Sequence, residues 1–127
     1  MADERKMKFR EEILKSGTRI SLGRNAENND ELMKEFKGEG NTVIHTEKPG
    51  SPFCVIEGLS PTKKDIREAA AFCALRSQDW RDNKSDVLVH VFTGKEVYKR
   101  KGMKTGMFGV RRFTEIKIKK REIEKIK

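Results

Sequence analysis

The stretch Thr18-Arg-Ile-Ser-Leu-Gly-Arg-Asn-Ala-Glu-Asn-Asn-Asp-Glu-Leu32 decides how this chain is organised. Ile20 and Leu22 alternate with polar neighbours, which is the period of a half-buried strand. Gly23 interrupts this pattern and supplies the backbone freedom that a sharp turn needs. Asn25 is a typical N-cap, so a helix is expected to start after it and to continue beyond Leu32. The stretch therefore predicts a strand, a glycine corner and a helix in direct succession.

This corner has two interpretations. The first turn of a helix carries unpaired backbone N–H groups that favour an anion, and Arg24 adds a side chain that binds phosphate in a bidentate manner. The corner could thus bind a phosphate group. It could equally be an ordinary strand–turn–helix connection in which Asn25, Asn28 and Asn29 only satisfy local backbone groups. The sequence leaves both open.

Hydrophobic periodicity predicts a series of short strands outside this stretch. They are residues 7–13, 18–22, 41–45, 53–56, 87–92, 96–100, 107–111 and 113–118. A hairpin turn is expected at 15–17, a loop with a Pro-Gly turn at 46–52 and a flexible basic loop at 102–106. Residues 78–85 are expected to form a polar loop around Trp80.

A second helix is expected after Ser60-Pro61. Thr62 can cap it and Asp65 follows three residues later, as in a capping box. The run of small residues at 69–71 allows close packing against a sheet. Together the patterns predict an α+β fold, in which a mostly antiparallel sheet packs with two main helices in a single domain.

The positive charge of the chain is concentrated near its C-terminus. The 127 residues carry a formal net charge of +9 with a pI near 9.7. Residues 95–127 contain 13 Lys/Arg and 4 Asp/Glu, whereas residues 1–94 contain 16 of each, so the whole excess lies in the last quarter. Such segregated charge favours a polyanionic partner. We expect a domain over 1–119 and a basic tail over 120–127, which has too little apolar content to pack.

Several function classes lack support in the sequence. No run of 18 apolar residues and no signal peptide is evident, so no membrane role is expected. Cys54 and Cys73 lie in apolar contexts, which indicates buried, reduced thiols in a cytoplasmic protein. The cysteines and the two histidines, His45 and His90, lack metal-ligand spacing, and no phosphate-binding loop of the Gly-x-x-x-x-Gly-Lys type occurs. We therefore expect no cofactor, no metal and no enzymatic activity.

Four blocks of the chain resemble the NFACT-R domain, the RNA-binding domain of the NEMF/RqcH group of ribosome quality-control proteins. The blocks occur in family order over roughly residues 8–118. They are Gly23–Leu32, His45 with Lys48-Pro49-Gly50-Ser51, Glu68–Ser77, and Val97 and Lys99 with Gly102–Met107. Pro52 stands where the family usually has a histidine, and Ile44 replaces an aromatic residue that often precedes the position of His45.

The resemblance implies RNA binding, with tRNA or ribosomal RNA as the partner in translation or ribosome quality control. Larger family members also carry an N-terminal domain, a helix-hairpin-helix segment and a coiled coil, which do not fit in 127 residues. A protein partner that carries those domains is therefore a second expectation, with this chain acting in trans. A hydrolase that uses His45 is a third candidate.

The candidate RNA-binding residues are polar or cationic and belong to three segments of the chain. They are Arg24, Asn25, Asn28, Asn29, His45, Lys48, Ser51, Lys99, Arg100, Lys101, Lys104, Arg111 and Arg112. Only Trp80, Tyr98 and Phe108 are expected to be exposed aromatic residues that could stack on bases. This scarcity favours recognition of RNA shape and backbone over sequence. A single RNA-binding surface requires the late cations to fold back beside the Gly23–Arg24 corner.

Overall fold

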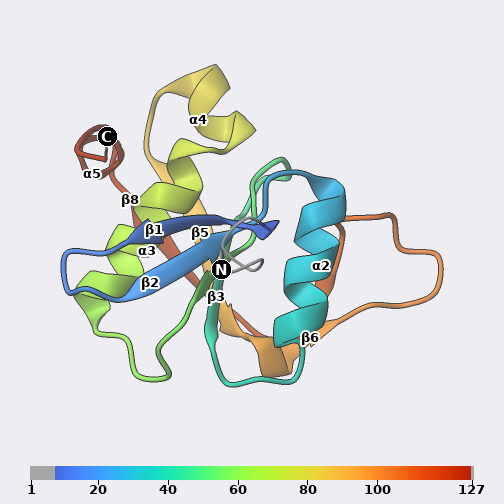
Figure 1. Cartoon of the computed structure of the whole chain (residues 1–127). Coiled ribbons are helices and arrows are strands. Elements are labelled where there is room, and N and C mark those ends of the chain that lie inside the picture. The colour runs from blue at the N-terminus through green and yellow to red at the C-terminus, as the bar shows by residue number, and fades with distance from the viewer. Residues whose placement is uncertain (1–7, 127) are drawn as a thin grey trace.

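The computed structural model describes residues 8–126, which form a six-stranded antiparallel sheet with helices on both faces (Figure 1). The strand order is β1-β2-β4-β3-β5-β8, and a separate two-stranded sheet pairs β6 with β7. The strands are β1 Arg10–Ile13, β2 Arg19–Leu22, β3 Thr42–Thr46, β4 Cys54–Ile56, β5 Val87–Thr93, β6 Val97–Tyr98, β7 Gly109–Val110 and β8 Thr114–Ile118. The helices are α2 Ala26–Phe36, α3 Lys63–Leu75, α4 Gln78–Asn83, the 3-10 helix η1 Gly94–Glu96 and α5 Lys120–Glu124. This architecture confirms the predicted α+β fold.

The two main helices bury opposite faces of the sheet. Ala69 to Ala71 of α3 are buried against the face that presents Ile44 and Ile56. Leu32 and Met33 of α2 are buried against the other face, where Val43 and Val55 belong to a second core cluster. The alanines have small side chains, so α3 lies close to the central strands, as predicted.

Both helices begin at the predicted caps. The side-chain oxygen of Asn25 accepts a hydrogen bond from the backbone N–H of Asn28 at 2.8 Å. Thr62 and Asp65 form the complete capping box, with backbone-to-side-chain distances of 3.0 and 3.2 Å. Such caps satisfy N–H groups that the helix itself leaves unpaired, and this fixes where α2 and α3 start.

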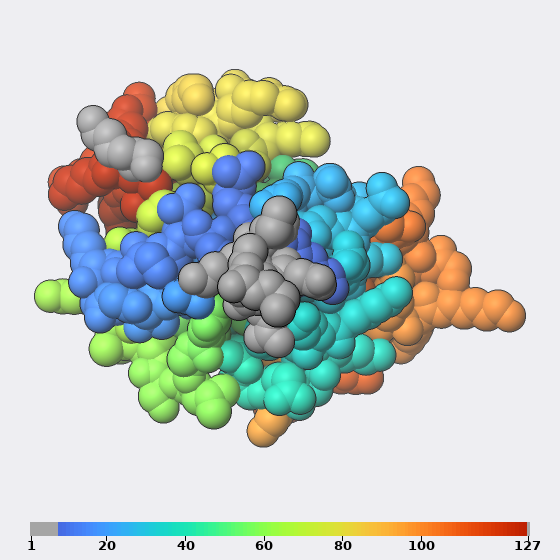
Figure 2. Space-filling view, in the orientation of Figure 1, coloured from blue at the N-terminus to red at the C-terminus, as the bar shows by residue number. Residues whose placement is uncertain are grey.

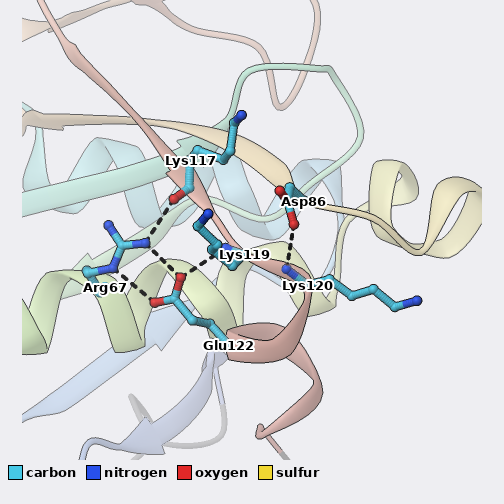
Figure 3. A network of polar contacts seen from close by, with 6 residues as sticks. All are labelled: Arg67, Asp86, Lys117, Lys119, Lys120 and Glu122. Atoms are coloured by element: carbon cyan, nitrogen blue, oxygen red, sulfur yellow. Dashed lines mark hydrogen bonds and ion pairs between the residues drawn. The ribbon is translucent and has the colours of Figure 1, made fainter.

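The expectation that residues after Lys119 cannot pack is wrong. The segment forms α5, whose Ile123 is fully buried against α3. Arg67 of α3 donates to both carboxylate oxygens of Glu122, at 2.9 and 2.7 Å, and to the carbonyl of Lys117 (Figure 3). Hydrogen bonding to Arg67 lowers the pKa of Glu122. Ile123 and the bidentate Arg67–Glu122 ion pair thus hold this helix on α3 in spite of the low apolar content of the segment.

The segment around Trp80 also differs from its prediction. It forms α4, which is capped by the hydroxyl of Ser77, and Trp80 itself is buried. Trp80 is therefore a core residue and not an exposed aromatic. The predicted strands at 96–100 and 107–111 shorten to the two-residue strands β6 and β7. The strand predicted over 7–13 is observed as β1, and Met7 lies outside the described residues.

Cys54 and Cys73 are buried free thiols, as predicted. Burial raises the pKa of Cys73 to about 12, so this thiol stays protonated at neutral pH. Within residues 8–126, no helix has the length and apolarity that crossing a membrane requires.

Candidate nucleic-acid interface

Gly23 allows the end of β2 to lie directly against helix α2. A Cβ atom at this position would overlap the side-chain oxygen of Asn29, so only glycine fits without a rearrangement. Its backbone N–H donates to the carbonyl of Phe53 at 3.2 Å. The glycine is thus required by close packing at the corner.

The three asparagines of the corner bind backbone groups of the protein. Asn28 accepts from the N–H of Arg24 at 3.0 Å and donates to the carbonyl of Lys8 at 2.8 Å. Asn29 accepts from the N–H of Phe53 at 3.0 Å, and both Asn28 and Asn29 are buried. The side-chain oxygen of Asn25 is used by the helix cap. These residues hold the corner in shape, and their oxygens are already occupied.

Arg24 differs from the asparagines because its side chain is exposed. It lines a cleft of about 860 Å³, and it forms no ion pair within the part of the chain that the structure describes, residues 8–126. A guanidinium group of this kind is available to a phosphate group. Arg24 is therefore the residue of the corner that can reach a ligand.

The cleft joins segments that lie far apart in the sequence. Its lining combines the corner, the loop that follows β3, the start of α4 and the chain that enters β7. Of the candidate residues, Arg24, Asn25, Asn29, His45 and Ser51 line it. Glu47 lines it too and is an acidic residue that the sequence analysis did not place there.

The loop of residues 46–53 forms one wall and is held by its own hydrogen bonds. Ser51 accepts from the backbone N–H of Thr46 at 3.2 Å and donates to the carbonyl of Pro52. Gly50 has a φ of +97°, which allows the turn to pass close to Gln78. Lys48 lies 3.7 Å from Asp79, with its side chain 60% exposed. Ser51 thus shapes the wall, whereas Lys48 is held only weakly.

His45 lies on the sheet face that forms the floor of the cleft, where it is paired in register with His90. Its Nδ1 lies 2.9 Å from the carbonyl of Thr46, which can only accept, so Nδ1 carries the proton. Burial lowers the pKa of His45 to about 4, with a smaller effect from His90 in the same direction. The ring is therefore neutral at pH 7.

The basic hairpin, residues 97–112, docks on the first turns of α2. The N–H of Gly106 donates to the carboxylate of Asp30 at 2.7 Å, and the ammonium of Lys99 lies 3.3 Å from the same oxygen. A Cβ at Gly106 would lie 2.8 Å from the Cβ of Ala26, which shows how closely the hairpin approaches the helix. Figure 2 shows this hairpin standing out from the body of the molecule beside α2. The part of the hairpin around Gly106 therefore lies against the start of α2, next to the Gly23–Arg24 corner.

Lys99 has an internal role within this hairpin. Besides Asp30, it donates to the carbonyls of Lys104 and Met107 at 2.6 and 2.7 Å, and its ammonium lies 4.5 Å from the ring centroid of Phe108. With these contacts its side chain is only 25% exposed. Lys99 thus shapes the hairpin and contributes little exposed charge.

The other candidate cations of the hairpin are exposed, and within residues 8–126 none of them forms an ion pair. They are Arg100, Lys101, Lys104, Arg111 and Arg112. Arg100 and Arg111 each lie 5.0 Å from the ring centroid of Tyr98. Both guanidinium groups therefore make cation–π contacts with the ring of Tyr98. The hairpin contains no acidic residue, so its charge is uncompensated.

Sequence reasoning missed Asp30, which holds the hairpin, and Phe113, which is 48% exposed on the sheet face. Asp30 acts on a group 76 residues away, so no local pattern could reveal it. Phe113 follows two arginines directly before β8, and its sequence pattern predicted only a strand. No group of three or more potential metal ligands occurs among the described residues.

Comparison with known proteins identifies the fold and the family. The structure is similar to that of the C-terminal part of the fibronectin/fibrinogen-binding protein from Streptococcus suis, with a TM-score of 0.80 and 23% sequence identity. The match covers 91% of this chain and 47% of that chain, so this protein spans about half the length of that structure. No curated protein matches the sequence. The family model of the NFACT protein RNA-binding domain matches residues 8–112, and the chain therefore belongs to this family of RNA-binding domains.

Proposed function

We propose that this protein binds structured RNA, either tRNA or ribosomal RNA, in translation or ribosome quality control in the cytoplasm. The family supports a non-enzymatic RNA-binding role in general. The observation that carries the proposal is the docking of the basic hairpin on α2 through Asp30. This contact joins the segment that carries the five exposed cations to the helix that begins next to Arg24.

The chemistry of this surface suits a sugar–phosphate backbone. Each phosphate that a lysine or arginine neutralises releases counterions, so several exposed cations give strong, salt-dependent binding. The basic hairpin provides several exposed cations and contains no acidic residue. Contacts of this type fix the position of an RNA and carry no sequence information. The proposed surface therefore recognises RNA by the path of its backbone.

The proposed role is non-catalytic. His45 is the one hydrolase candidate from the sequence, and its Nδ1–H is bound to a backbone carbonyl, with the ring held on the sheet by Phe53 at 4.4 Å. A neutral histidine in this setting suits packing and hydrogen bonding. Assaying RNA integrity during binding measurements tests this point, because cleavage that His45→Gln abolishes would contradict it.

Docking on an acidic protein that carries the other domains of larger family members is the second candidate. The exposed cations of the hairpin would serve such a partner as well. RNA affinity distinguishes the two, because a protein-docking surface has no reason to bind RNA with a salt dependence that reflects several phosphate contacts.

The test of RNA binding compares Arg24→Ala with Lys64→Ala. Both changes remove one exposed cation, but Lys64 lies on α3, on the opposite face of the sheet. We expect Arg24→Ala to weaken tRNA binding roughly 10-fold, since a charged hydrogen bond is lost, while its thermal unfolding stays unchanged. Lys64→Ala should bind like the wild type. Equal affinities for the two variants would remove Arg24 from the interface.

A further inference from the structure

Aromatic and imidazole rings form a row across the floor of the cleft. His45 lies 4.4 Å from Phe53, and Phe53 meets the edge of Phe108 at 5.9 Å between ring centroids. On the other side, His90 stacks on Phe113 at 3.9 Å with an angle of 19° between the rings. His45 and His90 are register partners on the neighbouring strands β3 and β5, so the two sets of rings lie next to each other on this face of the sheet.

This row is accessible in part. His45, His90 and Phe108 line the cleft, and the side chain of His90 is 22% exposed. Phe113 is 48% exposed at the end of the row. Core packing therefore leaves ring surface uncovered beside the cleft.

The floor is suited to a flat, uncharged, polar ring. His45 is neutral at pH 7, and its Nδ1–H is bound to Thr46, so its Nε2 is a hydrogen-bond acceptor. No described side-chain nitrogen or oxygen is buried without a hydrogen-bond partner. The imidazole therefore provides a neutral ring at the floor of the cleft.

The surroundings of the row are cationic. Arg24 lies on one wall of the cleft, and the basic hairpin supplies the other wall through Gly106 and Phe108. Glu47 also lines the cleft, and Glu115, whose carboxylate lies 3.0 Å from Nε2 of His90, is on the same sheet face. Stacking surface bordered by cations is the combination that binds unpaired nucleotides.

We propose that the cleft binds an unpaired nucleotide of the RNA, whose base stacks on the row of rings while its phosphates contact Arg24 and the basic hairpin. This inference rests on the proposed RNA-binding function and adds a ligand class, a base that is not held in a duplex. It also revises the expectation from sequence that RNA shape and backbone alone are recognised.

The test uses three RNA probes on one stem-loop. The first is the stem-loop with a blunt end, the second carries a four-nucleotide 3′ extension, and the third carries the same extension with abasic nucleotides. The third probe keeps the phosphates of the second and lacks its bases. We expect the wild type to bind the base-containing extension roughly 5- to 100-fold more tightly than the abasic one, the range for stacking of a base on an aromatic side chain.

The variants Phe113→Leu and Phe108→Leu keep apolar volume and remove the aromatic face. Both should lose most of this base-dependent gain and keep the affinity for the abasic probe. Phe113→Trp should retain the gain, and Leu59→Ala, which truncates another exposed apolar residue that does not line the cleft, should behave like the wild type.

The outcomes separate the two proposals. Equal wild-type affinity for the base-containing and abasic extensions would overturn the base subsite and leave RNA binding intact. Failure of the wild type to bind all three probes at low salt would overturn the proposed function itself. A base-dependent gain that survives in both leucine variants would show that the row of rings does not hold the base.

Discussion

The ammonium group of Lys99 lies 3.3 Å from the carboxylate of Asp30, and this ion pair joins the basic hairpin to helix α2. The same carboxylate oxygen accepts the N–H of Gly106, so one aspartate holds both arms of the hairpin. Lys99 is thereby a positioning residue, although its sequence context resembles that of the exposed cations beside it.

Lys99→Ala should therefore destabilise the protein more than Lys101→Ala. Lys99 donates to one carboxylate and two carbonyls, whereas Lys101 is exposed at the tip of the hairpin and has no ion pair among the described residues. We expect Lys99→Ala to lower the free energy of unfolding by about 1–2 kcal/mol and Lys101→Ala by less than about 0.5 kcal/mol. Denaturant unfolding measures both. Equal effects would mean that the contacts of Lys99 are not maintained in solution.

Two glycines of the hairpin provide a matched test of its docking. Gly102 and Gly106 both have positive φ, at +94° and +82°, so alanine is strained at either position. Only at Gly106 would the added Cβ meet helix α2, 2.9 Å from the Cα of Ala26, whereas nothing lies within 4 Å at Gly102. Gly106→Ala should thus weaken RNA binding more than Gly102→Ala in the same titration. The reverse order would show that docking on α2 is not needed for binding.

Exposed cations of the hairpin should set the salt dependence of RNA binding. The triple change of Arg100, Lys101 and Lys104 to Ala removes three of them. The slope of log K against log salt concentration should then become shallower by roughly 2–3, since each phosphate contact contributes roughly 0.7–0.9. The control replaces Lys63, Lys64 and Lys120, three exposed lysines of α3 and α5. An unchanged slope in the hairpin variant would place the phosphate contacts elsewhere.

The free energy of unfolding should fall as the pH is lowered from 6.5 to about 4, because His45 is buried as a neutral ring. Burial lowers the pKa of His45 in the folded protein to about 4, whereas its ordinary value is 6.5, so the unfolded chain binds the proton first as the pH falls. The contribution of neutral His45 to the free energy of unfolding is complete above pH 6.5. It is lost progressively between pH 6.5 and about 4, and the loss amounts to about 3 kcal/mol. His45→Gln should flatten the curve of unfolding free energy against pH in this window. An unaltered curve in that variant would contradict the burial of a neutral ring.

Local signals accounted for much of the fold. Asn25 and the Thr62–Asp65 capping box mark helix starts through hydrogen bonds within three residues, and the structure contains both. Alternation of hydrophobic and polar residues predicted the strands of the main sheet, and this pattern too is local in the sequence. Such features depend on near neighbours in the sequence, so the sequence alone reveals them.

The errors arose where a distant partner decides the outcome. Ile123 packs because α3 offers it a surface and Arg67 binds Glu122, 55 residues apart in the chain. Asn28 and Asn29 turn inward because Lys8 and Phe53 present backbone groups to them. Residue type alone cannot separate such internal contacts from ligand contacts. Several of the predicted site residues line one cleft, whereas the internal contacts of the asparagines and of Lys99 are evident only from the structure.

The central claim is that RNA lies along the Arg24 corner, the cleft and the basic hairpin together. Backbone amide chemical shifts recorded during titration with a structured RNA test it most directly, because they require no mutation. The account predicts that the amides of Arg24, Ala26 and Gly50 and those of residues 100–106 shift together at one RNA concentration. Shifts confined to α3 and α5, on the opposite face of the sheet, would contradict it.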